Sequence, residues 1–77
     1  MDIREVFARN LRRYRQEKGL SQEALAHEAG VDRTYISALE RSTYSASITM
    51  VDRLATVLGV EAAVLLQRPS KVERGKR

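Results

Sequence analysis

Three polar residues that could read DNA bases stand close together in this sequence. Arg33, Thr34 and Ser37 follow Asp32 at positions i, i+1 and i+4 of a predicted helix, and these positions share one outward face. Arginine can donate two hydrogen bonds to guanine, threonine can contact a thymine methyl group or a phosphate, and serine a phosphate or a base edge. The pattern favours base contacts in the major groove of double-stranded DNA, with plain solvent exposure as the alternative for each residue.

The sequence contains no comparable set of residues for catalysis or for metal binding. The chain has no Cys and a single His, His27, so a transition-metal site is not expected. It has no phosphate-binding glycine motif, and its carboxylates are scattered among basic residues. A chain of 77 residues also has too small a core to enclose a deep pocket. We therefore predict a protein that is not an enzyme, uses no cofactor or metal and takes no small-molecule ligand.

The net charge of +4 lies entirely at the end of the chain. Residues 67–77 contain five basic residues and one acidic residue, whereas basic and acidic residues balance over residues 1–66. We predict one domain over residues 1–66 and a basic, flexible tail over residues 67–77. The tail could bind DNA by releasing counterions, or it could only solubilise the protein. Because no secretory segment or run of about 18 apolar residues is found, we expect a cytoplasmic protein without a membrane partner.

The spacing of apolar residues predicts helices and no strands. The first helix should follow Asp2, which can form a capping box with Glu5, and end at Gly19. Its inward face should consist of Ile3, Phe7, Leu11 and Tyr14.

Two short helices around a glycine turn follow. The second helix is predicted over residues 22–29, between the cap Ser21 and Gly30, and the third from Arg33 to about Arg41. Small Ala26 permits a close approach to the first helix, and the space between the helices should be filled by Val31, Ile36 and Leu39. This arrangement is a helix-turn-helix, in which the third helix would enter the DNA groove.

The remainder of the chain predicts a polar loop and two further helices. The loop covers residues 42–47, and the fourth helix covers residues 48–58 with either Ser47 or Thr49 as its cap. The last helix spans residues 61–66 and stops before Pro69. The predicted fold is therefore all-α, compact and built from five helices.

The sequence resembles the lambda-repressor-like, or XRE, family of helix-turn-helix regulators, and within it the controller proteins of restriction–modification systems. The resemblance runs from about Phe7 to Leu66 and rests on Arg15, Gly19-Leu20-Ser21-Gln22, Leu25-Ala26, Asp32 to Ser37, Leu39-Glu40-Arg41 and Leu58-Gly59-Val60. Two positions depart from the family pattern. Ser42 stands where glycine is common, and Ser45-Ala46 stands where Asn-Pro is common, so the resemblance does not imply the path of this loop.

The resemblance also implies roles for individual residues. Gln22, at the start of the second helix, would donate to a DNA phosphate. Tyr35 would lie against the DNA backbone, with packing on the helix flank as the alternative. Arg15 and Glu40 would form an ion pair between the first and third helices. Two more residues are candidates for backbone contacts, namely Arg12 and Arg41.

An apolar surplus near the end of the domain predicts a homodimer. Residues 62–66 are all apolar, and five consecutive residues cover every side of a helix, of which a small core buries only one. We predict a dimer interface formed by Met50, Ala63, Val64 and Leu66, unless residues 61–66 fold back within the monomer. The expected function is that of a sequence-specific transcriptional regulator, a repressor or controller that binds a palindromic operator in double-stranded DNA as a homodimer. The alternative is a protein-interaction module such as a toxin-binding antitoxin.

Overall fold

The structure is a computed structural model that describes residues 1–69 and contains five α-helices and no strand over this range. The helices are α1 (Ile3–Glu17), α2 (Gln22–Ala29), α3 (Arg33–Glu40), α4 (Ile48–Leu58) and α5 (Ala62–Leu65). The all-α prediction is therefore confirmed. Most of the predicted basic tail, residues 70–77, lies outside the described residues.

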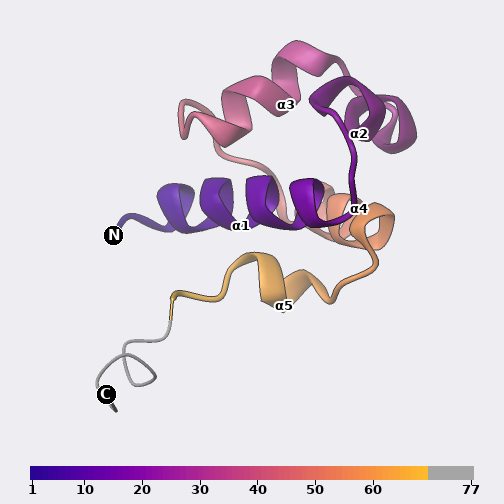
Figure 1. Cartoon of the computed structure of the whole chain (residues 1–77). Helices are drawn as coiled ribbons and strands as arrows, with labels where there is room; N and C mark the ends of the chain where they lie inside the picture. Colours follow the sequence, from indigo (N-terminus) through magenta and orange to yellow (C-terminus); the bar gives the residue numbers. More distant parts are fainter. Residues whose placement is uncertain (70–77) are drawn as a thin grey trace.

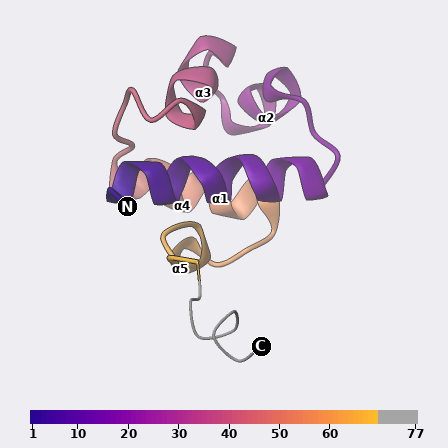
Figure 2. The same ribbon diagram turned by 60° about the vertical axis from the view of Figure 1, so that its left-hand side comes forward.

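The long helix α1 runs through the middle of the molecule. The helices α2 and α3 lie on one side of it and α5 lies on the other, in both views (Figures 1 and 2). The core unites all five helices through fully buried side chains, among which are Leu11, Leu25, Ile36, Leu39, Leu54 and Leu65. This packing fixes the direction in which the helix-turn-helix faces solvent.

Local capping explains where the helices begin. Four helices have an extended residue at the N-cap whose side-chain oxygen accepts a hydrogen bond from a backbone N–H of the first turn: Asp2, Ser21, Asp32 and Ser47. The choice between Ser47 and Thr49 is thus decided for Ser47, whose Oγ accepts from the Met50 N–H at 3.0 Å. The fifth helix is shorter than the predicted range 61–66, because Glu61 is extended and makes no side-chain cap bond.

The buried face of α1 differs from the prediction in one respect. Ile3 was expected inside but is 46% exposed, because it stands in the first turn of α1, at the edge of the core. Val6 and Ala8 are buried instead. Since α1 has neighbouring helices on two sides, it buries more than the single stripe that its apolar spacing indicates.

A side chain of α1 also holds the segment around α5. The amide of Asn10 donates to the carbonyl of Leu65 at 3.0 Å and to that of Gln67 at 2.9 Å. Leu65 itself is fully buried. A helix of four residues has too few internal hydrogen bonds to be stable alone. The two hydrogen bonds from Asn10 and the burial of Leu65 therefore hold α5 on the rest of the domain.

Candidate DNA interface

The turn between α2 and α3 has the geometry that a helix-turn-helix requires. Gly30 ends α2 with a φ of +74°, in the left-handed region that residues with a Cβ rarely adopt. The Val31 N–H then donates to the Ala26 carbonyl at 2.9 Å, which closes the turn. Ala26 is buried, so α2 packs closely within the domain.

The helix α3 carries all three predicted base-reading residues. Arg33 and Thr34 are exposed, and Ser37 is half-buried on the same helix. The hydroxyl of Thr34 donates to Asp32 Oδ1 at 3.0 Å, and the Thr34 N–H donates to the same oxygen at 3.1 Å. The hydroxyl is therefore engaged in capping α3, which leaves the methyl group of Thr34 as its part suited to a base contact.

These two hydrogen bonds also determine the charge at the start of α3. The backbone N–H of Thr34, and then its hydroxyl, hold the pKa of the Asp32 carboxyl below its usual value. The carboxylate accordingly stays ionised next to Arg33 and the positive end of the helix dipole.

The C-terminal end of α3 carries a contact that the sequence analysis did not anticipate. The exposed guanidinium of Arg41 donates through Nη1 to the hydroxyl of Ser37, one turn earlier. Arg41 is the C-cap residue of α3. Arg41, which was expected on the DNA backbone, and Ser37, which was expected on the bases, are thus hydrogen-bonded to each other.

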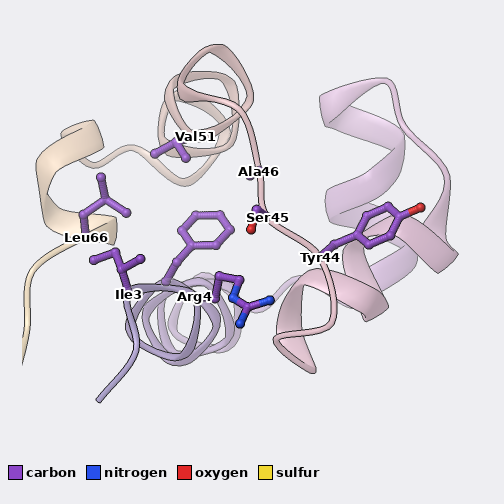
Figure 3. A pocket seen from close by; sticks show the side chains of 8 residues that line it. Ile3, Arg4, Tyr44, Ser45, Ala46, Val51 and Leu66 are labelled. Atoms are coloured by element: carbon purple, nitrogen blue, oxygen red, sulfur yellow. The ribbon is translucent and has the colours of Figure 1, made fainter.

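Two aromatic rings pack against each other beside α3, one from the helix itself and one from the loop that follows it. Tyr35 is half-buried and packs in an edge-to-face arrangement with Tyr44, with ring centroids 5.9 Å apart and planes inclined by 70°. Tyr44 lies in the loop before α4 and is 56% exposed, and its side chain points toward α3 in Figure 3. Tyr44 was not predicted as a site residue, although an aromatic residue in a polar, hydroxyl-rich loop was a signal for it. The pair closes one side of a hollow that Thr34 and Arg41 also line.

An ion-pair network connects α1, α2 and α3 beneath this surface. Arg15 Nε donates to Glu40 Oε2 at 2.6 Å and Arg15 Nη2 donates to Oε1 at 3.0 Å. Only 11% of the Arg15 side chain and 4% of the Glu40 side chain are exposed. The remaining Nη1 of Arg15 donates to the Leu20 carbonyl at 2.8 Å, so the guanidinium is held in a fixed orientation.

The same carboxylate binds the residue that was expected on a phosphate. Gln22 Nε2 donates to Glu40 Oε1 at 3.0 Å, which leaves the amide one further N–H and its carbonyl oxygen. Gln22 is half-buried at the first position of α2. Arg12, the other backbone candidate, is an exposed residue of α1.

A separate apolar surface lies where the ends of α1, α4 and α5 meet. Ile48 is 89% exposed and Leu66 is 41% exposed. Together with Ile3 and Ala63 they line one hollow, and we call these four residues the apolar patch. A neighbouring pocket of about 100 Å³ continues from Ile3 and Leu66 toward Tyr44 (Figure 3).

The apolar patch contains only part of the predicted dimer interface. Ala63 and Leu66 belong to it, whereas Val64 lines a different, polar hollow beside Arg9 and Arg68. Met50 is half-buried against the core. Ile48 was not predicted as part of the interface, although its position off the buried face of α4 was a signal for an exposed apolar side chain.

Residues 1–69 contain neither a cluster of metal-ligating side chains nor a membrane-crossing helix. In this part of the chain, no group of three or more acidic or His side chains is placed to hold a metal ion. Likewise, none of its helices has both the length and the apolar character needed to cross a membrane.

Comparison with known proteins places these features in a family. The helix-turn-helix family HTH_3 matches residues 11–65, which include the turn and all of α3. A hypothetical transcription factor of Neisseria meningitidis is 44% identical over 70 residues, which cover 91% of this chain and 66% of the relative. The control protein C.SmaI of Serratia marcescens is 41% identical over 76 residues, which cover 97% of this chain and 90% of the relative.

Solved structures agree with the sequence comparison. The crystal structure of the hypothetical transcription factor NHTF from Neisseria superposes with a TM-score of 0.87 at 45% identity, over 97% of this chain and 84% of that chain. The biofilm regulator SinR, solved in complex with DNA, superposes with a TM-score of 0.76 at 35% identity, over 79% of this chain and 98% of that chain. From its turn geometry, its five-helix fold and these matches, the chain belongs to the HTH_3 (XRE) family of helix-turn-helix transcriptional regulators, which are DNA-binding proteins and not enzymes.

Proposed function

We propose that this regulator recognises a palindromic operator in double-stranded DNA as a homodimer, in the cytoplasm of its cell. The observation that carries the proposal is the face of α3 on which Arg33 and Thr34 are exposed to solvent. Each subunit inserts α3 into one major groove, and the two half-sites lie about one helical turn, roughly 34 Å, apart.

The proposed base contacts follow from the chemistry of this face. Arg33 donates to guanine O6 and N7, and Thr34 places its methyl group against a thymine methyl, since its hydroxyl is bonded to Asp32. Ser37 can still donate its own hydroxyl proton to a base edge while it accepts from Arg41.

The proposed backbone contacts come from α1, α2 and the flank of α3. The free N–H of Gln22 and the backbone N–H groups at the start of α2 bind one phosphate. The network around Glu40 supports this contact, because it fixes the Gln22 amide before DNA arrives. Arg12 and the hydroxyl of Tyr35 bind further phosphates on either side of α3.

The dimer places its two-fold axis at the apolar patch. The helix α5, which contributes Ala63 to this patch, lies on the opposite side of α1 from α3 (Figures 1 and 2), so an interface here leaves both recognition helices free. A two-fold interface also gives the symmetric pair of helices that a palindrome requires.

Selection of binding sites from a random duplex library by the purified full chain tests the proposal. We expect the enriched sequences to contain an inverted repeat. Arg33→Ala should weaken binding to the selected site by about 1–3 kcal/mol and relax one base pair in each half-site. A library in which no sequence is enriched would contradict sequence-specific recognition, and equal losses on selected and random DNA would assign Arg33 to a phosphate.

The salt dependence of binding tests the part played by phosphates. The logarithm of the binding constant should fall linearly with the logarithm of salt concentration. Deletion of residues 69–77 should reduce the slope if the basic tail lies on DNA. An unchanged slope would mean that only residues of the domain contact the DNA backbone.

A further inference from the structure

The guanidinium of Arg41 lies on the base-reading side of α3, and this position does not suit a phosphate contact at the flank of the helix. Helix side chains lean toward the N-terminus of their helix. Accordingly, the guanidinium of Arg41 lies back along α3, where Nη1 donates to the hydroxyl of Ser37. Its charged group thus lies one turn closer to Arg33 than its Cα does.

The helical spacing places this group on the base-reading face. At about 100° per residue, Arg33, Ser37, Arg41 and Thr34 point in directions of about 0°, 40°, 80° and 100° around the axis of α3. All four therefore fall within about one quarter to one third of its circumference. A residue that served the flank of the helix alone would project outside this sector.

The guanidinium of Arg41 remains well equipped for a bidentate contact. Within residues 1–69 it pairs with no carboxylate, and its one side-chain partner is the neutral Ser37 hydroxyl. Of its five N–H groups, one is used by Ser37 and four are left. Tyr35 and Tyr44 line the hollow on the other side of Arg41 and restrict the directions open to its side chain.

We propose that Arg41 is a second base-reading arginine, held in its reading position by Ser37, so that α3 presents one guanidinium near each end of its DNA face. The proposal rests on the proposed function. Arg41 would donate to O6 and N7 of a guanine displaced along the groove from the one that Arg33 reads. Ser37 would then be a positioning residue for Arg41, because a guanidinium that is already oriented loses less rotamer freedom on binding.

Site selection with the full chain tests this role directly. The same random duplex library is offered to the wild type, Arg41→Ala, Arg41→Lys and Ser37→Ala. We expect Arg41→Ala to relax one guanine position in each half-site that Arg33→Ala leaves intact, with a loss of discrimination of about 5- to 150-fold. Arg41→Lys should restore affinity for random DNA but only part of the preference, because an ammonium cannot form the bidentate fork.

The positioning role of Ser37 has a separate readout. Ser37→Ala should weaken discrimination at the same guanine position as Arg41→Ala, and the double variant should lose less than the two single losses combined. Arg9→Ala is the matched control, since Arg9 is an exposed arginine of α1 beside Val64 and the C-terminal segment. It should leave the selected sequence unchanged.

Two outcomes overturn the proposal. If Arg41→Ala weakens every sequence alike and lowers the salt slope by about one, Arg41 binds a phosphate. If the selected sequence and the affinity are both unchanged, Arg41 does not contact DNA. Either result leaves the inverted repeat selected by the wild type in place, whereas a wild type that selects no sequence refutes the proposed function itself.

Discussion

Ser42 is the residue whose backbone conformation least suits its type. Its φ is +64°, and among residues 1–69 it is the one non-glycine residue with a positive φ. The Ser42 N–H donates to the Leu39 carbonyl and the Thr43 N–H donates to the Ala38 carbonyl, which is the hydrogen-bond pattern of a Schellman motif. Glycine usually occupies the left-handed position of this motif, and Ser42 also departs there from the family pattern.

Ser42→Gly should therefore stabilise the domain. Removing the Cβ relieves a left-handed conformation that costs an L-residue about 1–2 kcal/mol, less the extra freedom that glycine has in the unfolded chain. We expect a net gain of about 0.5–1 kcal/mol in the free energy of unfolding, measured by urea denaturation. Ser42→Ala, which keeps the Cβ, is the control and should show little gain. A destabilised Ser42→Gly would mean that the Ser42 side chain makes a stabilising contact.

Asp32 links the stability of α3 to pH. Its carboxylate has a lowered pKa because it accepts hydrogen bonds from the N–H and hydroxyl of Thr34. A carboxyl whose pKa is lower in the folded state stabilises the fold fully above its unfolded pKa of about 3.9. That contribution is lost as the pH falls through the folded value.

Asp32→Asn should consequently flatten the acid limb of the stability curve. Asparagine keeps an oxygen acceptor for the cap but cannot titrate. We expect the wild type to lose more stability than Asp32→Asn between pH 6 and pH 3, both measured by urea unfolding. Parallel losses in the two proteins would show that other carboxylates account for the acid sensitivity.

The Arg15–Glu40 network acts between elements, because it joins α1 to α3 and, through Gln22, to α2. Two buried charges gain little net free energy from each other, since both lose hydration. Their geometry instead fixes how the helix-turn-helix sits on α1. The first residue of α2 and the recognition helix thereby keep one mutual orientation.

A double-mutant cycle measures this coupling. Arg15→Ala or Glu40→Ala alone should lower the free energy of unfolding by about 3 kcal/mol, because each leaves a buried charge unpaired, and the double variant should recover part of the loss. The pair Arg13–Glu17 is the control, since both side chains are more than half exposed at an N–O distance of 3.1 Å. Its removal should change stability little. Strictly additive losses for Arg15 and Glu40 would exclude an energetic coupling between them.

For the domain as a unit, the positions of α3 and the apolar patch relative to α1 matter most. The helix α5, which carries Ala63 of the patch, lies on the opposite side of α1 from α3 (Figure 2), so one surface can serve DNA while the other serves a second copy. Ile48, Leu66 and Ile3 are the large apolar side chains of this patch, and each is substantially exposed in the monomer. Such a cluster usually marks an interaction surface.

Ile48→Glu and Leu66→Glu should disrupt the proposed dimer. A carboxylate introduced at the apolar patch would have to lose its hydration in the interface. We expect both variants to sediment as folded monomers at concentrations at which the wild type is a dimer, with unchanged helical circular dichroism. Val64→Glu is the comparison, because Val64 lines the polar hollow and should leave the dimer intact. If Val64→Glu alone dissociates the dimer, the interface lies on the other side of α5.

Much of the fold could be predicted because its signals are local. The bounds of α2 and α4 agree with the predicted residues 22–29 and 48–58, and each helix ends at a glycine with a positive φ. A cap bond joins residues two or three positions apart, so its partners are close whatever the rest of the chain does. The helix-turn-helix and the family could be recognised for the same reason.

The surfaces could not be predicted in the same way, because they depend on which helices cover each other. Ile3 and Ile48 carry the same side chain as buried Ile36, yet both are exposed at the margin of the packed helices. The bonds of Asn10 to the Leu65 and Gln67 carbonyls join parts of the chain more than fifty residues apart. Similarly, the amide of Gln22 bonds Glu40 only because α2 packs directly against α3. Apolar spacing predicts that a helix has an inward face, but the packing of its neighbours decides how wide that face is and which polar groups meet beside it.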